Sequence, residues 1–203
     1  MDFISPENLI TAFGLIGVAV VLFVETGLFF GFFLPGDSLL LTAGVYASKG
    51  IFPLWLLILV GTIAVILGDN VGYQSGKRAG SWWFKKPDSF FFKHGYIERA
   101  MHFYRRFGVL TIVVARVVPL VRTFAPIVAG IVGMKYRTFF ISNVVGGVLW
   151  VAGLSIVGFI LGNHFPGIEK YAGGFFIVVV VMSFAWTLLM PFIFKDSHSS
   201  HTK

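Results

Sequence analysis

The residues best suited to chemistry are five charged side chains that interrupt otherwise apolar stretches. They are Glu25, Asp37, Asp69, Arg116 and Arg122. A charge at hydrocarbon depth costs at least about 2.5 kcal/mol, and such groups mark ion, proton or substrate pathways. A guanidinium presents a planar fork of donors that suits phosphate or carboxylate better than an ammonium does. The inventory therefore predicts an anion site with carboxyl partners, provided that these stretches lie in a membrane.

The two arginines are predicted to bind the substrate. On one continuous helix, Arg116 and Arg122 would point about 120° apart, because they are six residues apart at about 3.6 residues per turn. Pro119 between them and Pro126 beyond them predict a broken helix, which would let both guanidiniums converge on one ligand. A helix that restarts after such a break adds donors and a positive dipole end. Pro119 and Pro126 are thus supporting residues of the predicted site.

The acidic residues are predicted to be proton-coupling groups or charge partners. An apolar surround favours the neutral form of a carboxyl group, whereas a nearby guanidinium favours its charged form. Glu25 and Asp37 could therefore change protonation when an anion reaches the arginines. Asp69 is expected where a span meets the cytoplasm, in a supporting role only. The alternative is that these charges simply pair and hold the fold together.

Composition restricts the class of protein. The chain has 203 residues, 57% of them hydrophobic and 12% charged, and its mean hydropathy is +0.86. A soluble globular domain carries about 25% charged residues, so an integral membrane protein is predicted. The chain has no cysteine, and none of its five histidines lies in the predicted apolar spans. Neither a metal, a cofactor nor an enzyme activity is therefore predicted. The net charge of +7 resides mostly in one loop beside membrane segments, which favours lipid contact over nucleic-acid binding.

One stretch is predicted to turn back inside the membrane. Residues 26–48 are apolar on both sides of a break that contains Pro35 and Gly36. Neither piece is long enough to cross about 30 Å of hydrocarbon at about 1.5 Å per residue. Proline and glycine together also stop a helix. We therefore expect a re-entrant hairpin with Pro35 and Gly36 at its tip, where they are predicted to be supporting residues of the site.

The distribution of basic residues predicts the topology. The loop at residues 77–106 holds eight bases against two acids, which marks the cytoplasmic side. An amphipathic helix in this loop is expected to contact anionic lipids of the inner leaflet. If residues 109–134 form a second hairpin, twelve bases lie inside and two outside. Both chain termini are then cytoplasmic, and the two hairpins enter from opposite faces.

The predicted fold is an all-α membrane protein, built as an inverted repeat of a re-entrant hairpin followed by a span. Ala43-Gly44, Lys49 and Gly61 recur at a constant offset as Ala129-Gly130, Lys135 and Gly147. Inverted repeats with broken helices near the midplane are a transporter architecture. About four full spans and two hairpins are expected in one polytopic domain. The predicted segments are a span at 9–24, a hairpin at 26–48, a span at 51–68, the basic loop at 77–106, a hairpin at 109–134, spans at 139–162 and 173–194, and a polar tail at 195–203.

Five motifs follow one another along the chain: Glu25, Pro35-Gly36-Asp37, Gly68-Asp69-x-x-Gly72-Tyr73-x-x-Gly76, Arg116-x-x-Pro119-x-x-Arg122 and Ala129-Gly130. In this order, they resemble the DedA family of the VTT, or SNARE-associated, superfamily. The family often has phenylalanine before its proline, where this chain has Val117-Val118. The resemblance implies a bacterial cytoplasmic-membrane protein that recycles the lipid carrier undecaprenyl phosphate, in several members with the proton motive force. It also implies that Glu25, Asp37, Arg116 and Arg122 occupy the family's essential positions.

The function expected from these observations is a transporter, or flippase, for a lipid phosphate. Its head group would lie between the hairpin tips, neutralised by the arginines, while the prenyl tail stays in lipid. A proton-coupled small-ion exchanger that uses the same carboxyls is one alternative. A non-transporting factor of envelope homeostasis is another. Self-association into a homo-oligomer is left open.

Overall fold

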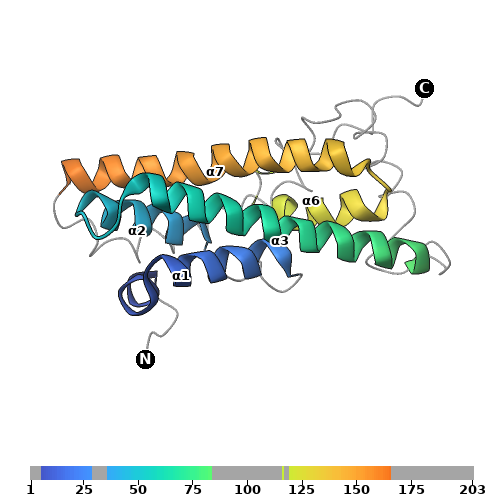
Figure 1. Cartoon of the computed structure of the whole chain (residues 1–203), viewed down its shortest axis with the longest axis horizontal. Coiled ribbons are helices and arrows are strands. Elements are labelled where there is room, and N and C mark those ends of the chain that lie inside the picture. The colour runs from blue at the N-terminus through green and yellow to red at the C-terminus, as the bar shows by residue number, and fades with distance from the viewer. Residues whose placement is uncertain (1–5, 29–35, 84–115, 117–118, 166–203) are drawn as a thin grey trace, which may run out of the picture.

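The structure is a computed structural model, and it describes residues 6–28, 36–83, 116 and 119–165. The described residues form helices and turns and contain no strand, which confirms the all-α class for this part of the chain. Figure 1 shows how the helices are arranged. They are α1 (Pro6–Gly27), α2 (Gly36–Ser48), α3 (Leu54–Trp83), α6 (Pro119–Ile131) and α7 (Tyr136–His164).

Two long helices, α3 and α7, form the frame of the molecule. They lie side by side and run in opposite directions (Figure 1). Their apolar stretches, Leu54–Gly80 and Tyr136–His164, contain 27 and 29 residues. At about 1.5 Å per residue each stretch is about 40 Å long, which is enough to cross about 30 Å of hydrocarbon. Large apolar side chains are exposed along both helices, as at Trp55, Leu59 and Leu149. Such a surface suits contact with lipid.

Two short helices, α2 and α6, each pack mainly against the long helix that does not directly follow them in the chain. Each contains 13 residues, so each is only about 20 Å long. Helix α2 lies on α7, and α6 lies on α3. Glycine allows the backbones to approach closely in both pairs. A Cβ added at Gly44 would collide with the backbone of α7 near Ser155, and one added at Gly130 would collide with the backbone of α3 near Tyr73. Small residues serve the same purpose in other membrane helix pairs.

The two short helices also end in the same way. The amide of Ile51 donates to the carbonyl of Tyr46, and the amide of Met134 donates to the carbonyl of Ala129. Gly50 and Gly133, one residue earlier in each turn, have φ angles of 78° and 69°. This is the Schellman ending of a helix, in which glycine adopts the left-handed conformation without a Cβ penalty. Each short helix therefore turns sharply into the long helix that follows it.

Helix α1 differs from the predicted span at residues 9–24. It is kinked at Gly14, whose φ of 55° and ψ of −143° are not helical. Its apolar part, Phe13–Gly27, is shorter than a span. The helix also continues through Glu25 rather than ending before it. Glu25 is tolerated within the helix because its carboxylate has a cationic partner, which is described below.

Helix α3 corrects the predicted span at residues 51–68. It does not end at Gly68 but continues to Trp83, so Asp69 lies within the helix and not at its end. The start of the predicted basic loop is therefore helical. Other predicted features lie outside the described residues: the rest of that loop, Pro35 at the first hairpin tip, the first arm of the second hairpin, the span at 173–194 and the tail at 195–203.

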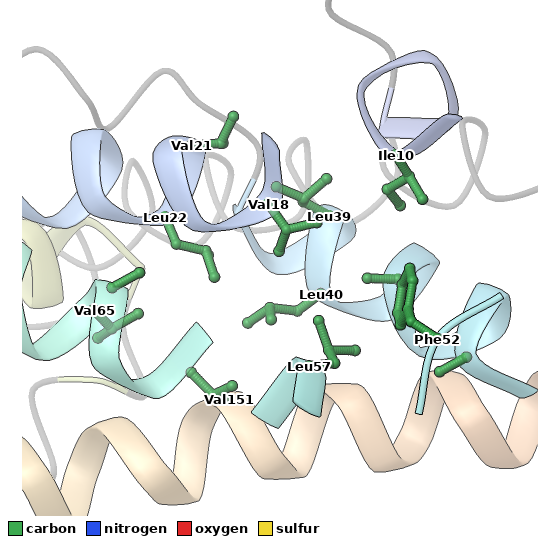
Figure 2. Packing of buried hydrophobic residues seen from close by; sticks show 13 residues of the cluster. Ile10, Val18, Val21, Leu22, Leu39, Leu40, Phe52, Leu57, Val65 and Val151 are labelled. Carbon is green, nitrogen blue, oxygen red and sulfur yellow. The ribbon is translucent and has the colours of Figure 1, made fainter. Parts of the chain in front are cut away.

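The apolar core lies in two clusters, with the charged residues between them. Figure 2 shows the first cluster, where α1, α2, α3 and α7 meet. The second cluster contains Tyr73 and Phe139, whose rings stack with their centroids 4.4 Å apart. Along α3, Asp69 lies between Val65 of the first cluster and Tyr73 of the second. The helices thus hold Asp69 between two apolar clusters.

Candidate functional site

Arg122 joins three helices through two carboxylates. It lies in the first turn of α6 and is buried. Its Nη2 donates to Oε1 of Glu25 on α1, and its Nη1 donates to Oδ1 of Asp37 on α2, both at 2.5 Å. Hydrogen bonds between ionised groups are about twice as strong as those between neutral ones. We call Glu25, Asp37, Arg122 and their neighbour Trp150 the Arg122 cluster.

Trp150 of α7 completes this cluster. Its indole Nε1 donates to Oδ1 of Asp37 at 2.9 Å. Its ring lies against the Arg122 guanidinium, whose central carbon is 4.3 Å from the ring centroid. This is a cation–π contact. Trp150 therefore touches both members of the Arg122–Asp37 pair.

Glycine at position 36 allows the Glu25 carboxyl group to lie against the start of α2. A Cβ added at Gly36 would collide with both oxygens and the carboxyl carbon of Glu25. Gly36 is thus a supporting residue because of the space that it leaves.

Arg116 lies in a separate cluster. Its Nη2 donates to Oδ2 of Asp69 on α3 and to Oδ1 of Asn143 on α7, the latter at 2.7 Å. Asn143 is held in turn, because its Nδ2 donates to the carbonyl of Ile66 at 3.3 Å. We call Arg116, Asp69 and Asn143 the Arg116 cluster. The structure therefore pairs Arg116 with Asp69, and not with Glu25 or Asp37.

The two clusters lie at two levels along α7. Asn143 and Trp150 are seven residues apart, so they share one face of the helix and are separated by about 10 Å along its axis. Pro119 begins α6, whereas Pro126 lies inside it without ending it. Arg122 therefore lies on α6, whereas Arg116 lies before this helix begins. The predicted convergence of both guanidiniums on one ligand is not the arrangement in this structure.

Both clusters retain hydrogen-bonding capacity. Among the described residues, Oε2 of Glu25 and the Nε atoms of Arg116 and Arg122 are buried without a hydrogen-bond partner. A buried polar atom without a partner costs about 1–3 kcal/mol. Within the same part of the chain, no group of three or more acidic or histidine side chains could hold a metal ion. The arrangement is suited to exchanging an anion or a proton.

Sequence reasoning missed Asn143 and Trp150. Both lie within α7, and they are an amide and an indole at a spacing of two helical turns in a mostly apolar segment. This spacing was the available signal. Sequence reasoning also gave Asp69 only a supporting role, although Asp69 is buried and paired with Arg116.

Comparison with known proteins identifies relatives. The VTT domain matches residues 34–160, a range that includes every residue of both clusters except Glu25. An uncharacterized membrane protein of Mycobacterium leprae is 42% identical over 163 residues, which are 80% of this chain and 73% of that protein. Protein DedA of Escherichia coli is 43% identical over 146 residues, 71% of this chain and 67% of that protein.

A third relative is the inner membrane protein YqjA of Escherichia coli. It is 36% identical over 158 residues, which are 75% of this chain and 69% of that protein. Aligned lengths thus range from 67% to 73% of these three relatives. No solved structure matches the chain.

Proposed function

Because the chain belongs to the VTT domain family and is a membrane protein of the DedA type, we propose that it moves a lipid phosphate across the bilayer. Undecaprenyl phosphate is the expected substrate. The observation that carries the proposal is the buried Arg122, which presents both Nη atoms to oxygen anions of two different helices. A phosphate head group can offer oxygen anions to the same two donors.

In the proposed mechanism, the head group replaces the carboxylates at Arg122. Both carboxyl groups then lose their cationic partner, and the buried Glu25 is neutralised by a proton from water. Phosphate entry is thereby coupled to proton uptake, and a proton gradient can drive the cycle. The prenyl tail remains in lipid and needs no tunnel through the protein.

The arrangement of the short helices supports an inverted repeat that could expose the site alternately to the two sides. Each half consists of a 13-residue helix, a Schellman turn and a long helix. Each short helix packs on the long helix of the other half. A movement of one half against the other would therefore change both contacts together, as in other transporters with broken helices.

We also propose that the end of the bundle near the start of α7 faces the cytoplasm and touches anionic lipids. The Tyr73 hydroxyl donates to the carbonyl of Met134 at 2.6 Å, and the Tyr136 hydroxyl donates to Oδ1 of Asn70 at 2.9 Å. These bonds bring the start of α7 beside the later part of α3. Exposed bases from both segments accordingly gather at one end, namely Lys77, Arg78, Lys135 and Arg137. Such clusters favour the cytoplasmic leaflet.

The test is translocation of undecaprenyl phosphate by the purified protein in liposomes, with and without a pH gradient. The wild type should move the lipid faster than empty liposomes do, and Arg122→Ala should reduce the rate to that background. Arg137→Ala is the matched control, because Arg137 is an exposed arginine at the start of α7. An Arg122→Ala protein that transports at the wild-type rate would refute the proposal.

A small-ion exchanger is the second candidate, and one observation favours it. The two clusters contain three carboxyl groups against two guanidiniums, so they have spare acidic capacity for a cation or proton. Liposomes without any prenyl phosphate separate the two functions. Proton or ion fluxes there that depend on Glu25 and need no lipid substrate would favour the exchanger. A non-transporting envelope factor would show neither activity.

A further inference from the structure

We propose that Trp150 is a positioning residue that keeps Asp37 ionised and in place while a phosphate head group occupies Arg122. This inference rests on the proposed function and specifies how the site divides its acidic groups. In the structure, Trp150 contacts both Asp37 and Arg122. Trp150 can therefore hold Asp37 in place while Arg122 exchanges a carboxylate for the phosphate.

The two carboxyl groups at Arg122 have different surroundings. The Glu25 side chain is 3% exposed, its Oε1 accepts from Arg122, and its Oε2 has no partner among the described residues. The Asp37 side chain is 24% exposed. Its Oδ1 accepts from two donors, Arg122 and Trp150. Asp37 is thus the more accessible acid and the one with a second donor.

This difference decides what happens when an anion takes Arg122. Asp37 retains the indole N–H, which stabilises its charged form. Glu25 retains no donor among the described residues, and an ionised carboxylate there would be buried without a partner, which is costly. One proton from water then forms an O–H bond on Glu25 for each anion bound, and Asp37 stays a carboxylate.

The other charged groups of the region do not remove this difference. Asp69 on α3 is paired with Arg116, and both belong to the Arg116 cluster. Among the described residues, the other charged groups of the Arg122 cluster are Glu25 on α1 and Arg122 on α6. The ring of Trp150 makes a second contribution, since its face fixes the plane of the Arg122 guanidinium. Trp150→Phe removes the N–H and keeps a ring, whereas Trp150→Leu removes both.

The experiment measures binding of farnesyl phosphate to the detergent-purified full-length protein and the number of protons taken up per bound ligand. Calorimetry in buffers of different ionisation enthalpy gives both quantities. All proteins are compared at one pH, about pH 8, where a phosphate monoester is mostly a dianion, so that the protonation of the ligand itself cancels. Farnesol is the ligand control. Trp55→Phe is the protein control, because Trp55 is 66% exposed on the outer face of α3.

We expect the wild type and Trp55→Phe to take up one proton per ligand. Trp150→Phe should take up more protons per ligand than the wild type, because Asp37 has lost the indole donor that favours its charged form, and its affinity should fall at least about tenfold for the lost hydrogen bond to a charged group. The double variant Trp150→Phe/Asp37→Asn should return to one proton. Trp150→Leu should bind still more weakly than Trp150→Phe, since the ring is also lost.

The outcomes separate this inference from the proposed function. A wild-type protein that binds farnesyl phosphate no better than farnesol would overturn the proposed function. Good wild-type binding together with an unchanged proton count in Trp150→Phe would overturn only the role of Trp150. Thermal unfolding of each variant shows whether the fold is retained, and a Trp150→Phe protein that merely unfolds earlier while keeping one proton per ligand also contradicts the inference.

Discussion

The two arginine clusters look alike in the sequence and differ in the structure. In the Arg116 cluster one guanidinium faces one carboxylate and one neutral amide, and all three side chains are buried. In the Arg122 cluster one guanidinium faces two carboxylates, and Asp37 is partly exposed. The first cluster is balanced in charge and closed, whereas the second has an excess acid and an accessible member.

This difference indicates a division of roles. A balanced and buried ion pair is costly to open, because each charge is left without a partner. A cluster with more acids than bases can release one carboxylate from the guanidinium, so that another anion binds there or the carboxylate takes up a proton. We therefore expect the Arg116 cluster to hold α3 and α7 together and the Arg122 cluster to handle the substrate.

The largest effect on stability is expected from Arg116→Ala. The substitution leaves Asp69 buried without its partner, which should lower the free energy of unfolding by about 3–5 kcal/mol. Equilibrium unfolding in mild detergent measures it. The double variant Arg116→Ala/Asp69→Ala should recover part of the loss, because neither charge then remains. Strictly additive losses in the double variant would show that the two residues do not act as a pair.

Arginine-to-lysine substitutions should separate the clusters by transport. Arg122 uses both Nη1 and Nη2, so Arg122→Lys loses the fork although it keeps the charge. We expect at least a tenfold lower rate of lipid translocation. The described polar contacts of Arg116 all use Nη2, and one ammonium can replace a single donor position. Arg116→Lys should therefore retain more of the rate, and an equal loss in both variants would contradict the division of roles.

The acids should differ in their effect on coupling to protons. Glu25→Gln removes the carboxyl group that is buried with one free oxygen, so transport should no longer respond to a pH gradient. Asp37→Asn should lower the rate by severalfold and keep the response, since Trp150 can still donate to the amide oxygen. Rates in liposomes at several imposed gradients measure both effects. A Glu25→Gln protein that is still accelerated by the gradient would assign the proton to another group.

Hydropathy predicted the positions of the helices better than it predicted which charged residues form pairs. The span at 139–162 lies within α7, and the second arm of the first hairpin corresponds to α2, because long apolar runs and a Pro-Gly break are local signals. The same reasoning ended helices at Glu25 and Gly68, since a charge in an apolar run looks like a boundary. Both helices continue because Arg122 and Arg116, far away in the sequence, neutralise those charges. Pairing between distant residues is not a local property, and so Asp69, Asn143 and Trp150 were underrated or missed.

The smallest effect on ligand binding is expected from Gly50, which can be compared with Gly36 beside the Arg122 cluster. Gly50 lies in the turn after α2 with a φ of 78°, and an added Cβ would meet nothing within 4 Å. Gly50→Ala should therefore cost about 1–2 kcal/mol of stability from the left-handed backbone and leave binding of farnesyl phosphate unchanged.

Gly36, in contrast, lies against the Glu25 carboxyl group, and its helical backbone is compatible with alanine. Gly36→Ala should lower the free energy of unfolding by more than Gly50→Ala does, because the added Cβ displaces Glu25 from its buried ion pair with Arg122. Binding should weaken severalfold, since Glu25 must move away from Arg122. Calorimetry and unfolding on the same two proteins distinguish the cases. If Gly50→Ala rather than Gly36→Ala weakened binding, the ligand site would have to lie near the turn and not at the start of α2.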